Sequence, residues 1–536
     1  MGLYLLDYGA GNVQSLANSL TRLGHSFKWI STPADFDNAT ILIFPGVGAF
    51  GSAVQSLESR GLREPLLKYI QSGRPFMGIC IGMQILFESS AESSYSGLGV
   101  IPCPIEEFDS SDKAVPHIGW NSADLIHKTV DPVHYYFVHS FCAKYNPEKY
   151  PAAAEWVHST TQYGRELFIS IVRKGNVFGT QFHPEKSGTA GLNLLDAWLR
   201  NPEFESESAS PVLKRTHGLT KRIVACMDVR ANDQGDLVVT KGDQYDVREK
   251  ADCTSAVAGQ VRNLGKPVGL AARYYEQGAD ELCLLNITSF RHSPLQDQPM
   301  LAVVRAAAEC VFVPLTIGGG IKDTVDPDGT KRSALEVAGA YFRAGADKVS
   351  IGSEAVYAVE RLRAAGKGDG TSAIETIAHA YGRQAVVVSV DPRRVYVDAE
   401  TYDGPYRDEV VTEKGKAWWY QCTVSGGRES RQVSVAELAR GVEALGAGEI
   451  LVNSIDRDGT GLGFDLDLLK LVKKNVHIPV IASSGAGSKE DFVQVFRETG
   501  VEAGLAAGIF HREEVGIADV KDALESAGIK VRLQRE

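Results

Sequence analysis

A cysteine between two glycines is the first residue of the chain that suggests chemistry. The segment GICIGMQ (78–84) places Cys80 between an apolar strand and a following helix. Glycines on both sides allow a sharp strand-to-helix turn, which lifts the thiol over the sheet edge toward helix N–H groups that favour a thiolate. A lone cysteine after a buried strand is more often a core residue, so Cys80 alone does not establish a nucleophile.

A second motif, FHPEKS (182–187), supplies what a nucleophilic thiol needs. His183 follows an apolar strand and can act as the base for Cys80, and Glu185 can orient the imidazole. A cysteine turn followed roughly 100 residues later by His-Pro-Glu closely resembles the class I glutamine amidotransferases. We therefore expect a glutaminase that uses Cys80, His183 and Glu185.

The same resemblance assigns an oxyanion hole and a glutamine-binding site. The glycines of the loop PGVG (45–48) permit a backbone that turns N–H groups toward an oxyanion, and the family position corresponds to Val47 and Gly48. The positions at which the family holds glutamine are Gln84, Glu92, Ser140 and Phe141. Without the resemblance, Gln84 and Glu92 would be interpreted as solvated surface residues.

The C-terminal region contains two similar halves. IVACMDV (223–229) is echoed by AVVVSVD (385–391), and LTIGGGI (315–321) by IASSGAG (481–487), in each case about 160 residues later. Eight strand-like segments alternate with helical ones over about 315 residues, which predicts a (βα)8 barrel with a two-fold internal repeat.

Two aspartates end matching strands of this predicted barrel. Asp228 and Asp391 lie four βα units apart, so they would face each other across the mouth where barrel active sites form. Two facing carboxyls can divide into acid and base if their surroundings separate their pKa values. A single strand-end aspartate often only caps a loop, but the matched positions favour a paired role.

Glycine- and serine-rich strand ends follow the same two-fold plan. Such turns free backbone N–H groups for anions, and two sets half a barrel apart suggest a long ligand with a phosphate at each end. The predicted phosphate-binding residues are Gly320, Gly352, Ser353, Asp458, Gly459, Ser484, Gly485, Ala507 and Gly508. Lys241, in the long loop after the first barrel strand, can close over the substrate, although an isolated lysine is more often only solvated.

Length and composition limit these interpretations. A chain of 536 residues needs two or more domains, and we predict an N-terminal open mixed sheet with flanking helices over 1–202, a polar linker over 203–219 and the barrel over 220–536. The net charge of -11 argues against a nucleic-acid partner, and no apolar run is long enough for a membrane span. Eight scattered cysteines without a C-x-x-C pair predict reduced thiols in the cytoplasm and no metal site.

Both regions together resemble one enzyme family. The segments CMDVR, TIGGGI, VSVDPRRVY, SIDRDGT and ASSGAG are similar to those of the fused, eukaryotic-type imidazole glycerol phosphate synthases of histidine biosynthesis. The resemblance implies that ammonia from glutamine reacts with a bisphosphorylated ribonucleotide, phosphoribulosyl-formimino-AICAR phosphate, with Asp228 and Asp391 as acid and base. It also implies an ammonia gate at the N-terminal face of the barrel, formed by Arg222, Glu281, Lys348 and Glu449. We expect no cofactor, and a monomer whose two domains pack on each other.

Two other interpretations stay open. A phosphoribosyl isomerase barrel shares the duplicated halves and the paired aspartates, but it needs no ammonia, so the intact Cys80 motif argues against it. A scaffold with an inactive glutaminase would lack a catalytic position, and none is missing here, although a motif is not an activity.

Overall fold

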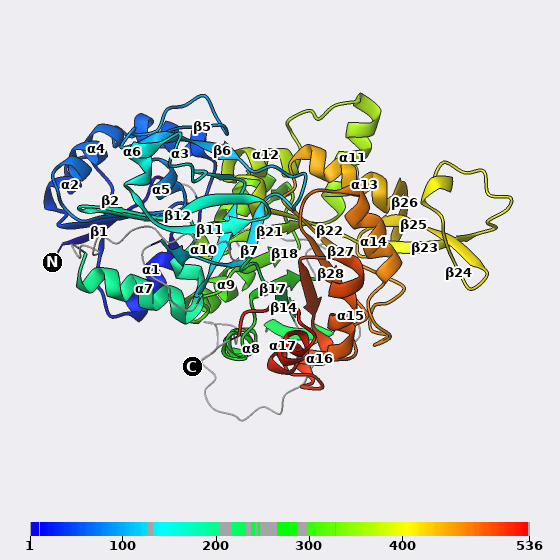
Figure 1. Ribbon diagram of the computed structural model, residues 1–536. Coiled ribbons are helices and arrows are strands. Elements are labelled where there is room, and N and C mark those ends of the chain that lie inside the picture. The colour runs from blue at the N-terminus through cyan, green and yellow to red at the C-terminus, as the bar shows by residue number, and fades with distance from the viewer. Residues whose placement is uncertain are drawn as a thin grey trace. The chain divides into compact units, whose positions relative to one another are not determined.

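The computed structural model describes residues 2–9, 11–126, 132–202, 217–231, 237–241, 245–246, 265–287, 299–326 and 328–533. The chain forms two compact units (Figure 1). The first contains Met1–Thr220 together with His379–Ala385, and the second contains Lys221–Ala378 and Val386–Glu536. Each unit is described below by itself.

An eight-stranded mixed sheet forms the centre of the first unit. Five strands run parallel in the order β2 (Lys28–Ile30), β1 (Leu3–Leu6), β3 (Ile41–Phe44), β4 (Phe76–Ile79) and β13 (Val177–Thr180). The sheet continues antiparallel through β12 (Glu166–Lys174), β11 (Val157–Tyr163) and β8 (Asp124–Leu125). This is the mixed sheet that the sequence predicts.

Helices cover both faces of this sheet, because its central strands β1, β3 and β4 are buried at every position. Along β3, Leu42 and Phe44 join one hydrophobic core while Ile41 and Ile43 join the other, as the two-residue period of a strand requires. The covering helices are α2 (Asp35–Asn38), α3 (Phe50–Ser59) and α4 (Arg63–Gln71) on one face, and α1 (Gln14–Arg22) and α7 (Gly188–Arg200) on the other (Figure 1).

Shorter elements surround the carboxyl ends of the parallel strands. Helix α5 (Ile81–Gln84) follows β4 directly, and β7 (His117–Ser122) pairs antiparallel with β9 (His134–His139). A further sheet contains β5 (Phe87–Ser90), β6 (Ile101–Glu107) and β10 (Phe141–Cys142). Of the predicted site residues, Gln84 lies in α5 and Phe141 in β10.

Eight parallel strands of the second unit close into a barrel, since the first strand pairs with the last. In order around the ring they are β14 (Arg222–Ala231), β17 (Glu281–Asn286), β18 (Leu315–Gly318), β21 (Lys348–Ile351), β22 (Val386–Val390), β27 (Glu449–Asn453), β28 (Val480–Ser483) and β29 (Ala503–Ala506). The predicted (βα)8 barrel is confirmed. The third strand begins at Leu315, because the apolar residues 311–313 before Pro314 lie in the preceding loop.

Helices follow the barrel strands in the expected alternation: α8 (Gly265–Glu276), α9 (Pro299–Cys310), α10 (Ala334–Ala344), α11 (Ser353–Ala365), α12 (Ala373–Tyr381), α13 (Val435–Leu445), α14 (Leu466–Asn475), α15 (Lys489–Thr499), α16 (Gly508–His511) and α17 (Ile517–Ser526). Several of them end on glycine. Gly345 caps α10 with φ 116, and a Cβ there would lie 2.4 Å from the Cβ of Ala308, so only glycine fits.

Two insertions of the barrel form small sheets of their own. The loop after β22 contains β23 (Pro392–Val397), β24 (Val411–Glu413), β25 (Lys416–Val424) and β26 (Glu429–Ser434), which project from the barrel in Figure 1. The loop after β18 contains the hairpin β19 (Thr324–Val325) and β20 (Lys331–Arg332).

Candidate active sites

Cys80 lies at a strained turn between β4 and α5. Its φ of 51 and ψ of -105 are rare for a residue with a Cβ and cost about 1–3 kcal/mol, so the surrounding structure must impose them. Gly82 makes the turn possible, because a Cβ at that position would lie 2.0 Å from the carbonyl oxygen of Phe44. The backbone N–H of Cys80 donates to the Thr180 carbonyl at 2.7 Å, which ties the turn to β13.

His183 and Glu185 form a buried pair next to Cys80. His183 directly precedes the short 3-10 helix η1 (Pro184–Lys186) and Glu185 lies within it, and the Nδ1 atom of His183 lies 2.7 Å from Oε1 of Glu185. Burial by itself lowers the pKa of His183, but the negative charges of Glu185 and Cys80 outweigh burial and hold that pKa well above its usual value. The surroundings of His183 therefore favour its protonated form.

Gln181 is a neighbour of Cys80 that the sequence interpretation missed. Its Nε2 atom donates to the Cys80 sulfur at 3.6 Å, and its Oε1 accepts from Nε2 of Gln84 at 3.0 Å. Gln84 is buried and also donates to the carbonyl of Phe141 at 2.9 Å, so it is not a surface residue. The position of Gln181, two residues before His183 at the end of β13, was the signal available in the sequence.

The loop with Val47 and Gly48 follows β3. The hydroxyl of Tyr8 donates to the Val47 carbonyl at 2.7 Å, which fixes the peptide that carries the N–H of Gly48. Gly48 has φ 149. Tyr8 is a second contact that residue spacing did not predict, because it comes from the end of another strand.

The side chain of Glu92 contacts the first residue of α3, the helix that follows the loop with Val47 and Gly48. Its Oε2 accepts a 2.8 Å hydrogen bond from the backbone N–H of Phe50, the first residue of the helix. Burial raises the pKa of Glu92 to about 7, although the Phe50 hydrogen bond opposes the shift. Ser140, also predicted to hold glutamine, is buried, and its Oγ makes no hydrogen bond within the described part of the chain.

The two predicted barrel aspartates lie on opposite sides of the ring. Asp228 belongs to β14 and Asp391 follows β22, four strands away in a ring of eight, and both are half-buried. Asn453 donates from Nδ2 to Oδ1 of Asp391 at 2.9 Å. Burial raises the pKa of Asp391, the Asn453 hydrogen bond opposes the shift, and the charge of Asp458 adds to it.

The predicted phosphate-binding residues form two groups. Gly320, Gly352 and Ser353 follow β18 and β21, whereas Ser484, Gly485, Ala507 and Gly508 follow β28 and β29. The turn with Asp458 and Gly459 belongs to the loop after β27, which contacts the second group through a 2.8 Å bond from the N–H of Gly463 to the Gly485 carbonyl. The backbone of Lys241 ends β15 (Leu237–Lys241), but its side chain lies outside the described residues.

Four buried charges form a closed ring at the first residues of four barrel strands. Arg222 contacts both Glu281, at 2.7 Å, and Glu449, and Lys348 lies 2.6 Å from each of the same two carboxylates. All four side chains are at most 1% exposed. Burial by itself raises the pKa of Glu281. The positive charges of Lys348 and Arg222 outweigh burial and hold that pKa below its usual value, so the carboxylate is charged.

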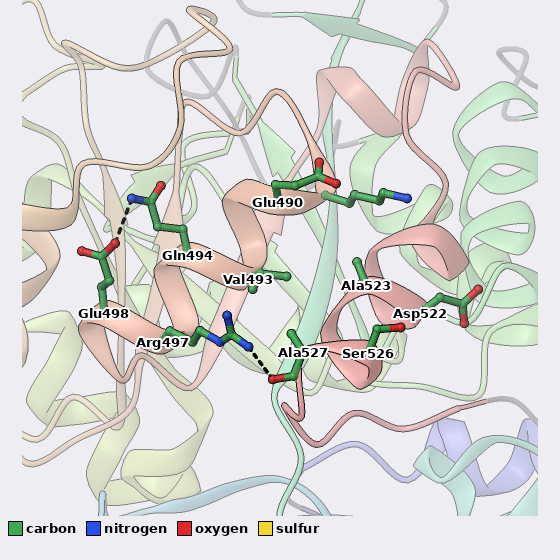
Figure 2. Close-up of a pocket in the computed structure, with 10 residues that line it drawn as sticks. Glu490, Val493, Gln494, Arg497, Glu498, Asp522, Ala523, Ser526 and Ala527 are labelled. Atoms are coloured by element: carbon green, nitrogen blue, oxygen red, sulfur yellow. Dashed lines mark hydrogen bonds between the residues drawn. The ribbon is translucent and has the colours of Figure 1, made fainter.

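A groove of about 740 Å³ lies elsewhere on the barrel, between α15 and α17 (Figure 2). Within it Gln494 donates to Glu498 at 2.9 Å and Arg497 to the Ala527 carbonyl at 2.7 Å, as Figure 2 shows. None of the predicted site residues lines this groove. In the described ranges no three His, Cys, Asp or Glu side chains are arranged to hold a metal ion, and no helix is long and apolar enough to cross a membrane.

Comparison with known proteins identifies both units. Residues 4–200 match the family model of class-I glutamine amidotransferases, and residues 222–516 match that of the histidine biosynthesis proteins. The chain is 52% identical to imidazole glycerol phosphate synthase hisHF of Emericella nidulans, with 99% of this chain and 98% of the relative covered. It is 52% identical to the Schizosaccharomyces pombe protein of the same name, over 98% of this chain and 99% of that one.

A plant relative and an archaeal one extend the comparison. The chain is 53% identical to the chloroplastic imidazole glycerol phosphate synthase hisHF of Arabidopsis thaliana, over 99% of this chain and 89% of the relative. The subunit HisF of Haloarcula marismortui is 42% identical over 59% of this chain and 99% of its own length. With its amidotransferase and histidine-biosynthesis regions in one polypeptide, the chain belongs to the bifunctional imidazole glycerol phosphate synthase family.

Proposed function

We propose that the first unit hydrolyses glutamine through Cys80, His183 and Glu185. The thiolate of Cys80 attacks the amide carbon of glutamine, and the protonated imidazole of His183 gives its proton to the departing nitrogen. Water then cleaves the thioester and releases glutamate. The observation that carries this proposal is the strained, positive-φ conformation of Cys80 beside the 2.7 Å His183–Glu185 pair.

The loop with Val47 and Gly48 would supply the N–H groups for the oxyanion, and Glu92, Ser140 and Phe141 would hold the glutamine. The orphaned, buried Oγ of Ser140 supports a ligand contact, because an unsatisfied buried hydroxyl is costly. The side-chain N–H groups of Gln84 donate to the Phe141 carbonyl and to Oε1 of Gln181. Any contact of Gln84 with glutamine would therefore come through its own Oε1 or through the Phe141 carbonyl that it binds.

The second unit would then join the ammonia to phosphoribulosyl-formimino-AICAR phosphate and cyclise it to imidazole glycerol phosphate and AICAR ribonucleotide. Asp228 and Asp391 are the proposed acid and base, and the raised pKa of Asp391 supports a proton-transfer role. The two groups of strand-end residues on opposite sides of the ring suit a substrate with a phosphate at each end.

Ammonia would reach the two aspartates through the barrel interior, past the ring of Arg222, Glu281, Lys348 and Glu449. A dry route keeps ammonia unprotonated and reactive. The interior beyond the ring is lined by small and apolar side chains, among them Val224, Cys226, Ala503 and Leu505. The free cysteines among the described residues support work in a reducing compartment such as the cytoplasm.

A steady-state assay of the purified full chain tests this proposal. Glutamate release should be slow with glutamine alone and faster when the bisphosphorylated ribonucleotide is added, with one AICAR ribonucleotide formed per glutamate. Glutamate release without any AICAR ribonucleotide would support the glutaminase activity but contradict the cyclase activity. Product formed without any nitrogen source would favour an isomerase-type barrel.

A further inference from the structure

Two buried histidines of the first unit face each other across a strand pair. His117 begins β7, His139 ends β9, and the two are register partners in the antiparallel ladder. Nδ1 of His117 lies 3.3 Å from Nε2 of His139. They lie in an aromatic box, with His117 stacked between Phe137 and Tyr163 at centroid distances of 4.9 and 4.0 Å.

The hydrogen bonds at either end of the pair determine which ring nitrogens carry protons. Nδ1 of His139 lies 2.8 Å from the Phe141 carbonyl, which can only accept, so this nitrogen must be protonated. In a neutral ring Nε2 of His139 is then an acceptor, and Nδ1 of His117 must donate to it. That leaves Nε2 of His117 as an acceptor.

Asn121 at the other end agrees with this assignment independently. Its Oδ1 accepts from the backbone N–H of Ser122 at 2.9 Å, which makes Nδ2 the atom that faces Nε2 of His117 at 3.3 Å. The donors therefore run in one direction from Asn121 to Phe141. Burial lowers the pKa of His117 well below its usual value and that of His139 to about 3, so both rings are neutral.

The Phe141 carbonyl connects the pair to Cys80. The same oxygen accepts from Nε2 of Gln84, whose amide also donates to Oε1 of Gln181. Because Oε1 of Gln181 is used in this way, its Nε2 must face the Cys80 sulfur, 3.6 Å away. The residues whose side chains form this series are all at most 5% exposed, whereas Phe141, whose backbone carbonyl they share, is half-buried.

We propose that His117 and His139 are positioning residues of the glutaminase site. The neutral pair sets the carbonyl of Phe141, which orients Gln84 and through it makes Gln181 donate to the thiolate of Cys80. Hydrogen bonds in which the acceptor is ionised are the strong ones, so the loss of this orientation acts mainly on the thiolate form. This inference rests on the proposed role of Cys80.

The test compares two variants of His139 in the full-length protein. His139→Phe keeps an aromatic ring in the box but removes both hydrogen bonds, whereas His139→Asn retains a donor near the position of Nδ1. We expect kcat for glutamine hydrolysis to fall about ten- to a hundredfold in His139→Phe, and the rise of kcat/KM with pH to move to higher pH. His139→Asn should recover most of both effects, and synthesis from added ammonium should be unchanged in either variant.

A double-mutant cycle and a packing control separate positioning from stability. Gln181→Leu alone should move the pH profile in the same direction, and the double variant with His139→Phe should be no worse than the more impaired single variant. The ring of Phe108 belongs to the same box, with its centroid 5.3 Å from that of His139, and makes no hydrogen bond in it. Phe108→Leu should therefore lower the melting temperature but leave the pH profile of the glutaminase unchanged.

Equal losses in His139→Phe and His139→Asn with an unmoved pH profile, or additive effects with Gln181→Leu, would reduce the pair to core packing and overturn the inference. The parent role of Cys80 is tested separately with Cys80→Ala. If that variant keeps its glutaminase, the proposed function fails, whereas a dead Cys80→Ala with a fully active His139→Phe removes only the positioning role.

Discussion

Oε2 of Glu92 accepts a 2.8 Å hydrogen bond from the backbone N–H of Phe50. The Glu92 carboxyl therefore caps the N-terminus of α3, directly after the loop with Val47 and Gly48. Burial raises the pKa of this carboxyl to about 7. A carboxyl with a raised pKa is neutral below that value and charged above it. The proposed contact of Glu92 with glutamine should therefore lose its charge as the pH falls through about 7.

We accordingly expect KM for glutamine to rise as the pH is lowered from 8 to 6, in glutaminase assays with the ribonucleotide substrate present. Glu92→Gln should have, at every pH, the high KM that the parent protein reaches at low pH, and so abolish this dependence. A variant whose KM still changes with pH as in the parent protein would assign the titration to another group.

Tyr8→Phe should impair the glutaminase more than it impairs folding. The change removes the 2.7 Å hydrogen bond to the Val47 carbonyl and so loosens the peptide that presents the N–H of Gly48. We expect kcat to fall about tenfold or more, since a lost oxyanion donor costs about 10²–10³. The matched control is Tyr69→Phe, which removes a buried 3.0 Å bond to the Pro75 carbonyl away from the site.

Both tyrosine variants should lose about 1 kcal/mol of unfolding free energy in denaturant titrations. Only Tyr8→Phe should lose kcat. If the two variants have the same kcat, Tyr8 contributes stability and nothing more.

Asp391→Asn should abolish cyclisation, with a loss of about 10²–10⁴ in turnover, while glutamine hydrolysis continues. Asn453→Ala provides a finer test, because the Asn453 hydrogen bond lowers the pKa of Asp391 and its removal should raise that pKa further. The limb of the pH–rate profile that Asp391 controls should move to higher pH, whether Asp391 is the base or the acid. An unmoved profile would exclude Asp391 as the titrating group.

Lys348→Met should destabilise the barrel strongly. The change leaves Glu281 and Glu449 buried with one cation in place of two, and breaking a buried ion pair costs about 3–5 kcal/mol. Lys470→Met is the control, since its 3.4 Å contact with Glu498 is exposed and should be worth at most about 1 kcal/mol. Equal unfolding free energies for the two variants would contradict this view of the ring.

Much of the barrel could be predicted from sequence because its signals are local. Apolar runs, glycine caps and the repeated halves locate the eight strands, and strand order then places Asp228 and Asp391 on opposite sides of the ring. The small sheet after β22 could not be predicted in this way, since the pairing of β23 with β25 joins segments separated by about 20 residues.

The surroundings of Cys80 were less predictable. Cys80, His183 and Glu185 carry a recognisable spacing, whereas Gln181, Tyr8 and His139 act through hydrogen bonds between elements far apart in the chain. Tyr8 and His139 have no sequence pattern of their own, and Gln181 has only its position two residues before His183. Their roles depend on which neighbours the fold brings together.

The most direct test of the whole account is Cys80→Ala assayed with two nitrogen sources. The variant should form no imidazole glycerol phosphate from glutamine, yet keep the parent rate with saturating ammonium at alkaline pH. Cys103→Ala is the matched control, because burial raises the pKa of that thiol to about 12 and it should be inert. Retention of glutamine-dependent synthesis by Cys80→Ala, or loss of the ammonium-dependent reaction as well, would contradict a nucleophile that serves a separate barrel site.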